Sequence, residues 1–140
     1  MNEIPYIEQW IYSKLTGDSA LNTAVSGRIY SYVAPEKAAC PLVVFSPLSQ
    51  QGVNGIGGKA LYESQYTIKA IGQNMDVSAL SAITDRIDAI FKAAGPDTVN
   101  TSLHVRSLYQ NSVSYTEEQA DGVYLHMGAV FRIKIGRAHV

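Results

Sequence analysis

LYESQYTIKAIGQNMDVSALSAITDRIDAIFKAA, residues 61–94, is the stretch that decides the fold. Its first part, residues 61–71, alternates between two kinds of side chain. Tyr62, Tyr66, Ile68 and Ala70 fall on one face of an extended chain, and Glu63, Gln65, Thr67 and Lys69 fall on the other. Alternation of this kind predicts a strand with one face buried against a core.

After a turn at residues 72–75 the period changes, because the apolar residues recur at steps of three and four. They are Val77, Leu80, Ile83, Ile87, Ile90, Phe91 and Ala94. This spacing predicts an amphipathic helix whose apolar stripe packs on a sheet. Asp76 is placed to cap the first free N–H groups of the helix. Lys92 lies near its C-terminal end, where the helix dipole favours a positive charge. Gly95 and Pro96 then end the helix.

Two shorter helices are predicted at the start of the chain. Residues 3–16 place Ile4, Ile7, Trp10, Ile11 and Leu15 on one stripe. Gly17 stops this helix, and Asp18 is the expected N-cap of a second helix over residues 19–25.

The remaining apolar segments predict strands. Residues 28–35 are expected to be extended, and residues 41–48 form a β-rich run in which Pro47 indicates an edge position or a bend. Residues 103–109 alternate weakly. The last strand, residues 123–134, places Val123, Leu125, Met127, Ala129, Phe131 and Ile133 on one face. Its length is typical of a central strand that defines the register.

The predicted fold class is therefore α+β, in one domain covering residues 1–134. It has two N-terminal helices, an antiparallel or mixed sheet of about four strands, and one long helix packed on that sheet. Residues 96–102 are expected to be a polar turn.

The composition favours a protein that buries surface against partners. Charged residues make up 16% of the 140 residues, against about 25% in typical domains. Tyrosine, of which there are nine, is enriched in interface cores. The net charge is −1 with no basic stripe, so no nucleic-acid readout is expected. No secretory signal or membrane-spanning run is found, and Cys40 has no second cysteine with which to form an intrachain disulfide.

A glycine-rich segment precedes the central strand and is the first candidate assembly loop. Its residues are Gln51, Gly52, Val53, Asn54, Gly55, Ile56, Gly57, Gly58 and Lys59. A phosphate-binding P-loop is excluded, because Val53 and Ala60 occupy positions that require Gly and Ser or Thr, and a strand follows instead of a helix. The physical expectation is a flexible hairpin connection, with Asn54-Gly55 as a candidate turn.

A second candidate contact loop lies within residues 110–122, which are expected to be a polar loop or the end of a hairpin. Tyr115, Glu117, Glu118 and Asp121 are its candidate residues. The spacing of its carboxylates is not that of a Ca²⁺ loop.

The sequence offers no motif for catalysis. His104 and His126 are expected on separate strands, where a surface pair is the ordinary outcome even if those strands are neighbours. A nucleophilic serine elbow is absent from the sequence, and Asp85 and Asp88 are expected to be solvated. We therefore expect no enzyme activity, no metal site and no cofactor.

Four short motifs carry a family resemblance: Asp18-Ser-Ala-Leu21, Gly27-Arg28-Ile29-Tyr30, Val33-Ala34-Pro35, and the strand from Pro41 to Phe45. Their order resembles the first half of the tail completion or tail terminator proteins of tailed phages. The resemblance implies a virion protein, assembled in the host bacterial cytoplasm from a phage or prophage gene. It would form a homo-oligomeric ring, a hexamer in that family, that ends the tail tube and joins it to the head connector. The resemblance also implies that the glycine-rich loop meets a neighbouring subunit or the tube protein.

Two alternatives stay open at this point. The first is a neck or head-completion protein that acts on the portal side of the same kind of particle. The second is a free-standing α+β enzyme or ligand-binding domain.

The last residues raise a separate question. Residues 134–140 can be encoded by AAG ATC GGA AGA GCA CAC GTC, which resembles the start of a short-read sequencing adaptor. Residues 135–140 are therefore predicted to be read-through sequence, and Arg137 and His139 are given no functional weight. Resequencing of the source DNA decides this question.

Overall fold

The computed structural model describes residues 4–35, 37–55, 58–99 and 103–137. Within these ranges the chain forms three helices and six strands. The helices are α1 (Ile4–Thr16), α2 (Ser19–Val25) and α3 (Val77–Phe91). The strands are β1 (Ile29–Ser31), β2 (Leu42–Gly55), β3 (Gly58–Gln73), β4 (Asp97–Val99), β5 (Leu103–Gln119) and β6 (Gly122–Arg137). The α+β class is confirmed.

The strands form one sheet in the order β1-β2-β3-β6-β5-β4. The sheet is mixed, because β1 runs parallel to β2 and every other described pair is antiparallel. The sheet was expected to have about four strands, but it has six, because a short strand is added at each edge. These are β1, in the segment expected to be extended, and β4, in the segment expected to be a turn. Each has three residues, too few for alternation to be recognised in a sequence.

The central strands are placed as the alternation predicts. β6 lies between β3 and β5, and Ile68 of β3 stands opposite Phe45 on one side and Ala129 on the other. β2 carries a register shift at Leu48, just after Pro47, and β5 carries one at Gln110. The predicted bend near Pro47 is therefore confirmed, and Leu48 is 61% exposed.

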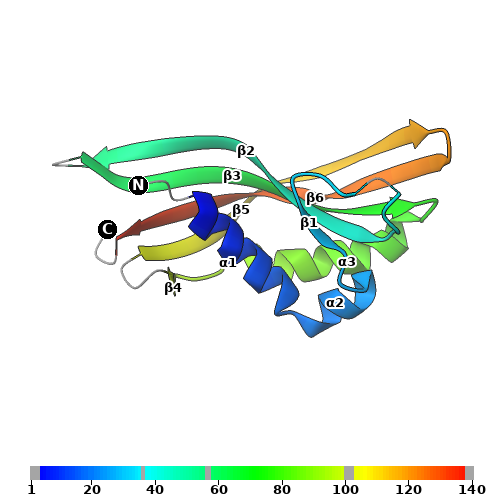
Figure 1. Cartoon of the computed structure of the whole chain (residues 1–140), viewed down its shortest axis with the longest axis horizontal. Coiled ribbons are helices and arrows are strands. Elements are labelled where there is room, and N and C mark those ends of the chain that lie inside the picture. The colour runs from blue at the N-terminus through cyan, green and yellow to red at the C-terminus, as the bar shows by residue number, and fades with distance from the viewer. Residues whose placement is uncertain (1–3, 36, 56–57, 100–102, 138–140) are drawn as a thin grey trace.

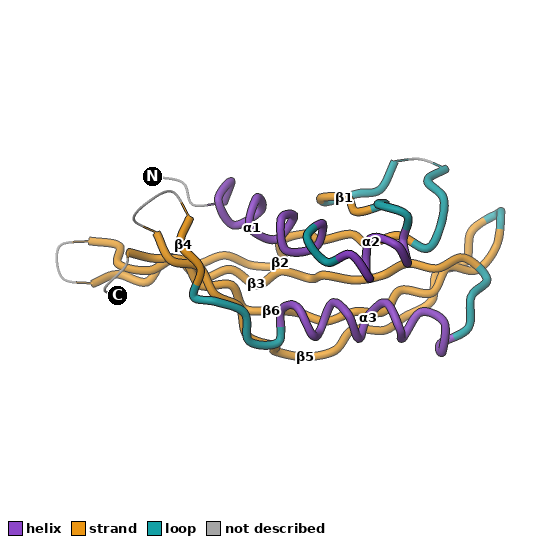
Figure 2. Tube along the Cα trace, turned by 90° about the horizontal axis from the view of Figure 1, so that it is seen from below, coloured by secondary structure: helices purple, strands orange, loops and turns teal. Residues whose placement is uncertain are grey.

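The three helices cover one face of the sheet, as Figure 2 shows. Side chains from α1, α2, α3 and the covered face of the sheet form one apolar core. Its largest fully buried members are Tyr66, Phe45, Phe91, Phe131, Ile7, Ile11, Leu15, Leu21, Ile68, Leu80, Ile87 and Ile133. The rings of Trp10 and Phe131 both lie 5.7 Å from that of Phe91, so α1, α3 and β6 meet at this point.

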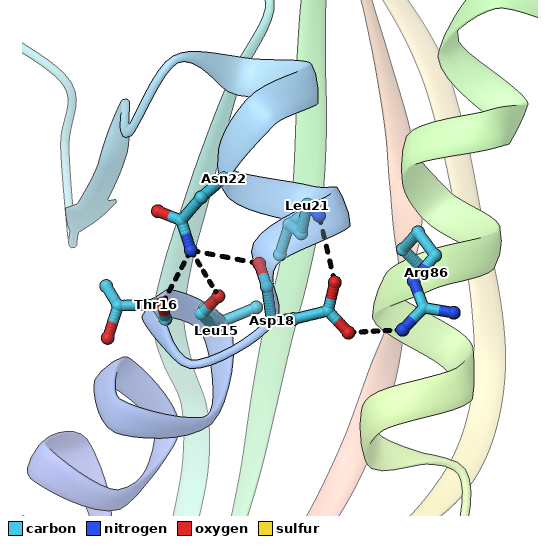
Figure 3. A network of polar contacts seen from close by, with 6 residues as sticks. All are labelled: Leu15, Thr16, Asp18, Leu21, Asn22 and Arg86. Carbon is cyan, nitrogen blue, oxygen red and sulfur yellow. Dashed lines mark hydrogen bonds and ion pairs between the residues drawn. The ribbon is translucent and has the colours of Figure 1, made fainter.

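Asp18 joins the helices through a network of polar contacts (Figure 3). Its Oδ1 accepts a 2.9 Å hydrogen bond from the Leu21 N–H, which confirms the predicted N-cap of α2. Its other carboxylate oxygen forms an ion pair with Arg86 of α3. The Asn22 side-chain amide donates to the carbonyls of Leu15, Thr16 and Asp18 at 3.2, 2.6 and 3.0 Å. These bonds satisfy carbonyl groups at the end of α1.

Two residues assigned to the core by periodicity lie outside it. Val77, the first residue of α3, is 59% exposed. Val123 is 43% exposed, because it lies at the end of a hairpin. The predicted read-through at residues 135–140 stays a prediction. Ile135 continues β6 opposite Tyr62 and Val105, and residues 138–140 lie outside the described residues.

Candidate functional site

Two long hairpins extend to opposite ends of the molecule (Figure 1). The first, called here the β2–β3 arm, comprises residues 49–55 of β2 and 58–65 of β3. The second, the β5–β6 arm, comprises residues 111–119 of β5 and 122–130 of β6. The β2–β3 arm begins just beyond the register shift after Pro47, and the β5–β6 arm begins just beyond the one after Tyr109. The arms give the molecule two different ends, each formed by paired strands.

The structure corrects the expected conformation of the first candidate loop. Gln51, Gly52, Val53, Asn54 and Gly55 belong to β2, and Gly58 and Lys59 belong to β3. Asn54 pairs with Lys59 and Gly55 pairs with Gly58, so Asn54-Gly55 is part of the ladder and not the turn. Ile56 and Gly57 lie outside the described residues. The segment was expected to be a loop because Gly and Asn favour turns, but cross-strand pairing extends the hairpin through them.

The second candidate loop was expected to be either a polar loop or the end of a hairpin, and the structure shows the end of a hairpin. Tyr115, Glu117 and Glu118 lie in β5, and Asp121 lies in the tight connection between Gln119 and Gly122. Tyr115 and Glu117 stand opposite His126 and Tyr124, whereas Glu118 stands opposite Val123. Since neighbouring positions alternate between faces, Glu118 lies on the other face of the arm from Tyr115 and Glu117.

In both arms one strand is paired on one side only, among the described residues. β1 pairs with β2 over residues 43–45, and β4 pairs with β5 over residues 103–105. The N–H groups of Ser107 and Tyr109 donate to the carbonyls of Ala94 and Lys92 at 3.0 and 3.1 Å. Beyond these contacts, residues 49–55 and 111–119 present free backbone edges. Proteins usually protect such edges with charges, Pro or bulges. Residues 49–55 carry no charge or Pro, whereas residues 111–119 carry Glu117 and Glu118.

The face of the sheet opposite the helices carries a network of side chains across strands. Arg132 donates from Nη2 and Nε to Glu63 Oε1 at 2.6 and 2.9 Å. Gln65 accepts from the Ser49 hydroxyl at 2.9 Å and donates to Gln110 at 3.1 Å. These bonds connect β2, β3, β5 and β6 and hold the side chains of this face in place.

A cavity of about 450 Å³ lies between the segment that connects β1 to β2 and the β5–β6 arm. On one side it is lined by Ala34, Pro35, Lys37, Ala38, Cys40, Leu42 and Ile71. The arm contributes Glu117, Gln119, Ala120, Asp121, Tyr124 and His126. Two of the four residues predicted for the second contact loop, Glu117 and Asp121, therefore meet at this cavity.

His126 is the buried polar group of this cavity, with 7% of its surface exposed. Its ring stacks on Tyr115 at 4.4 Å, and its Nε2 lies 3.3 Å from Glu117 Oε1. Burial, and then the nearby Lys69 ammonium, lower the pKa of His126 in spite of Glu117. The imidazole is therefore neutral at pH 7. Its Nδ1 is buried without a hydrogen-bond partner among the described residues.

Two further groups of the cavity stay protonated at neutral pH. The Tyr124 hydroxyl donates to Asp121 Oδ2 at 2.7 Å, and this bond raises the pKa of Tyr124 to about 12. Burial raises the pKa of the Cys40 thiol, so its reactive thiolate form is disfavoured. The cavity thus offers exposed carboxylates without an activated nucleophile.

His104 and His126 do not approach each other, although their strands are neighbours. His104 stands opposite Gly136 and His126 stands opposite Tyr115, at opposite ends of the β5–β6 ladder. No group of three His, Cys, Asp or Glu in the described part of the chain is arranged to hold a metal ion. Nor is any helix there long and apolar enough to cross a membrane.

The sequence analysis singled out segments in both arms, the first as a loop and the second as a loop or hairpin end, but it did not find the cavity. His126 was considered only as a possible partner of His104, and Cys40 only as a cysteine without a disulfide partner. Their meeting requires the segment of residues 32–41 to lie beside a hairpin that is distant in sequence, and periodicity within one strand carries no such information. Within that segment the backbone of Lys37 has a positive φ of 63°, which is typical of a tight bend.

The sequence matches the model of a known protein family. The family described as tail completion protein gp17 matches residues 9–134. The chain belongs to this family. It is a structural protein of phage-type tails, and the family is not a family of enzymes. The expected resemblance to tail completion proteins is confirmed.

A solved structure shows the same fold. A chain in the virion of a native gene transfer agent particle superposes with a TM-score of 0.73 at 16% sequence identity. The superposition covers 90% of the present chain and 91% of that chain. No curated protein matches the sequence.

Proposed function

We propose that this tail completion protein ends the tail tube and joins it to the head by forming a ring of identical subunits. The ring has six members if it follows the resemblance to tail terminators. One face of the ring stops further tube subunits from adding, and the other face receives the head connector. The subunits assemble on tails in the cytoplasm of the host bacterium, from a phage or prophage gene.

The single observation that carries this proposal is the pair of unlike arms at opposite ends of the molecule (Figure 1). A contact between one end of a subunit and the opposite end of the next is heterologous, and it closes into a ring when the rotation returns to the start. A free β edge is a ready template for another chain. Edges that remain free in an isolated subunit are consistent with a protein whose stable state is an assembly.

The low charge and the ordered outer face support the same function. A face whose side chains already bond to each other loses little side-chain entropy when a partner covers it. Glu63, Gln65 and Arg132 are held in this way before assembly. Two buried surfaces, one toward the tube and one toward the head, would also account for a charged fraction of 16%.

Electron microscopy of the purified protein, with and without purified tail tubes, tests the proposal. We expect rings at one end of each tube and tubes of uniform length. A protein that stays monomeric in the presence of tubes and leaves tube length uncontrolled would contradict the proposal. Parallel binding to purified capsids separates the neck alternative, because a head-completion protein binds capsids in the absence of tails.

A further inference from the structure

We propose that neighbouring subunits share an ionic contact, in which the basic pair Arg106 and Lys134 of one copy faces the acidic cavity beside the β5–β6 arm of the next copy. Glu117 and Asp121 supply the carboxylates of that cavity. This inference rests on the proposed ring, and it names one pair of surfaces that the ring would bring together.

The basic pair lies on the face of the sheet opposite the helices, where Arg106 is exposed between two buried positions of β5. Arg106 stands directly opposite Lys134 of β6, and like charges in directly opposite positions destabilise a sheet. On the next strand Glu63 stands opposite Lys134, but Arg132 engages this carboxylate through two hydrogen bonds. Among the described residues neither Arg106 nor Lys134 forms an ion pair. The basic pair therefore lacks a carboxylate of its own there.

The carboxylates of the cavity lack a cationic partner in the described part of the chain. Their hydrogen bonds come from neutral groups, such as the Gln119 amide to Glu117 at 3.1 Å and the Tyr124 hydroxyl to Asp121 at 2.7 Å. Lys37 lies on the opposite wall and forms no described ion pair with either carboxylate. With His126 neutral, two carboxylates and one ammonium leave the cavity with an excess of negative charge, which favours a cationic partner.

His126 gives a second, independent sign that this cavity receives a donor. The residue lines the cavity and is 7% exposed. Its Nε2 lies 3.3 Å from Glu117 Oε1, and since a carboxylate only accepts hydrogen bonds, Nδ1 is the acceptor of the neutral ring. This Nδ1 is buried without a partner among the described residues, which costs free energy. A guanidinium, with five N–H donors and no acceptor, suits a wall of two carboxylates and an unmet nitrogen.

The two surfaces cannot meet within one chain. Arg106 and Glu117 lie on the same continuous strand β5, and at about 3.3 Å per residue their positions are roughly 35 Å apart. Figure 1 shows this strand running from the end of the molecule that carries β4 to the end that carries the β5–β6 arm. A second copy is therefore the partner. A contact between unlike surfaces is the heterologous kind that a ring requires.

Charge reversal and its rescue test the contact. Arg106→Glu should reduce ring-capped tubes by roughly tenfold or more, because it places like charges together between copies. Within the isolated subunit the same variant puts a carboxylate opposite Lys134, so its urea midpoint should stay at or above the wild-type value. This difference in sign separates lost assembly from lost folding.

Two further variants complete the test. Asp121→Lys should also reduce capping, and the double variant Arg106→Glu, Asp121→Lys should restore most of it, because an opposite pair is regained at every interface. Glu118→Lys is the matched control on the other face of the same arm, and it should leave capping near the wild-type level. Normal capping by both single variants would overturn the inference.

A cross-linking measurement does not depend on any variant. Zero-length carbodiimide cross-linking of wild-type rings should join Lys134 of one copy to Glu117 or Asp121 of another, as mapped by mass spectrometry of mixed isotopically labelled subunits. Wild-type rings without this cross-link would overturn the inference while leaving the ring intact. Cross-linked pairs of subunits that never form rings on tubes would keep the contact and contradict the proposed function.

Discussion

Asp18 shows how one carboxylate serves two helices at once (Figure 3). The Arg86 hydrogen bond, and then the Leu21 N–H, lower the pKa of Asp18 below its ordinary value. The folded state therefore prefers the charged carboxylate. Because the unfolded pKa is about 3.9, this stabilisation is complete above that value. It is lost as the pH falls through the lower pKa of the folded state.

Two substitutions separate the roles of Asp18. Asp18→Ala removes both the cap and the ion pair, and the lost cap alone should cost about 1 kcal/mol of unfolding free energy. Asp18→Asn keeps a capping oxygen, so it should cost less at pH 7, and its deficit relative to wild type should shrink as the pH falls below the unfolded pKa. Urea unfolding at pH 7 and at pH 3 measures this. An Asp18→Asn deficit that is the same at both pH values would contradict the account.

Gly128 is a position where the sheet leaves no room for a side chain. A Cβ there would lie 2.3 Å from the Ile68 carbonyl oxygen and 2.5 Å from the Lys69 Cα. Gly128→Ala should therefore push β3 and β6 apart and destabilise the protein by about 1–3 kcal/mol. The midpoint of urea unfolding reports the loss. Ser114→Ala, at an exposed position of β5, is the control and should change the unfolding free energy by less than about 0.5 kcal/mol.

The helix α3 is the element that holds the covered face of the sheet, through Leu80, Ile83, Ile87 and Phe91. Phe91 contacts both Trp10 of α1 and Phe131 of β6, so Phe91→Ala should cost about 3–5 kcal/mol. Val77→Ala, on the same helix but 59% exposed, should be close to neutral. Thermal unfolding by circular dichroism compares the two. Similar losses from both would show that α3 docks differently.

Elements were predictable where a pattern repeats over many residues. The helix caps at Asp18 and Asp76 follow from the chemistry of single side chains next to apolar stripes, and both are present. β1 lies in the segment expected to be extended, but its parallel pairing with β2 could not be predicted from a local pattern. β4 was missed because three residues are too few for alternation to be recognised. The end of the β2–β3 arm was expected to be a loop because it is rich in glycine. Glycine content describes one segment, whereas strand pairing depends on two segments.

The position of some candidate site residues was predictable, but not what surrounds them. Glu117 and Asp121 were named as candidate contact residues, and the structure locates both at the cavity. Their contact role stays a prediction. His126 could not be assigned to this site, because its burial comes from Tyr115 and from a segment earlier in the chain. Local composition thus identifies polar segments, whereas only tertiary contacts show which other residues line a cavity with them.

At the scale of the whole molecule, the fold separates a stable body from two arms. The helices cover the central part of the sheet (Figures 1 and 2), and their side chains form one apolar core with those of the covered face. The end of the β2–β3 arm lies away from this body, so its backbone pairs depend mainly on the two strands themselves. A short two-stranded ribbon is marginally stable alone, and a neighbouring copy would add the contacts that it lacks.

Removing the end of this arm should therefore separate assembly from folding. Deletion of residues 53–58 leaves Gly52 opposite Tyr62, joined by Lys59, Ala60 and Leu61, a connection length that hairpins commonly use. We expect a near-native circular dichroism spectrum and urea midpoint, because the core is untouched. We also expect the loss of tube capping and of infectious particles in a complementation assay. Normal particle yield from the shortened protein would exclude the β2–β3 arm from the subunit contact, and a large fall in the urea midpoint would show that the arm belongs to the stable body.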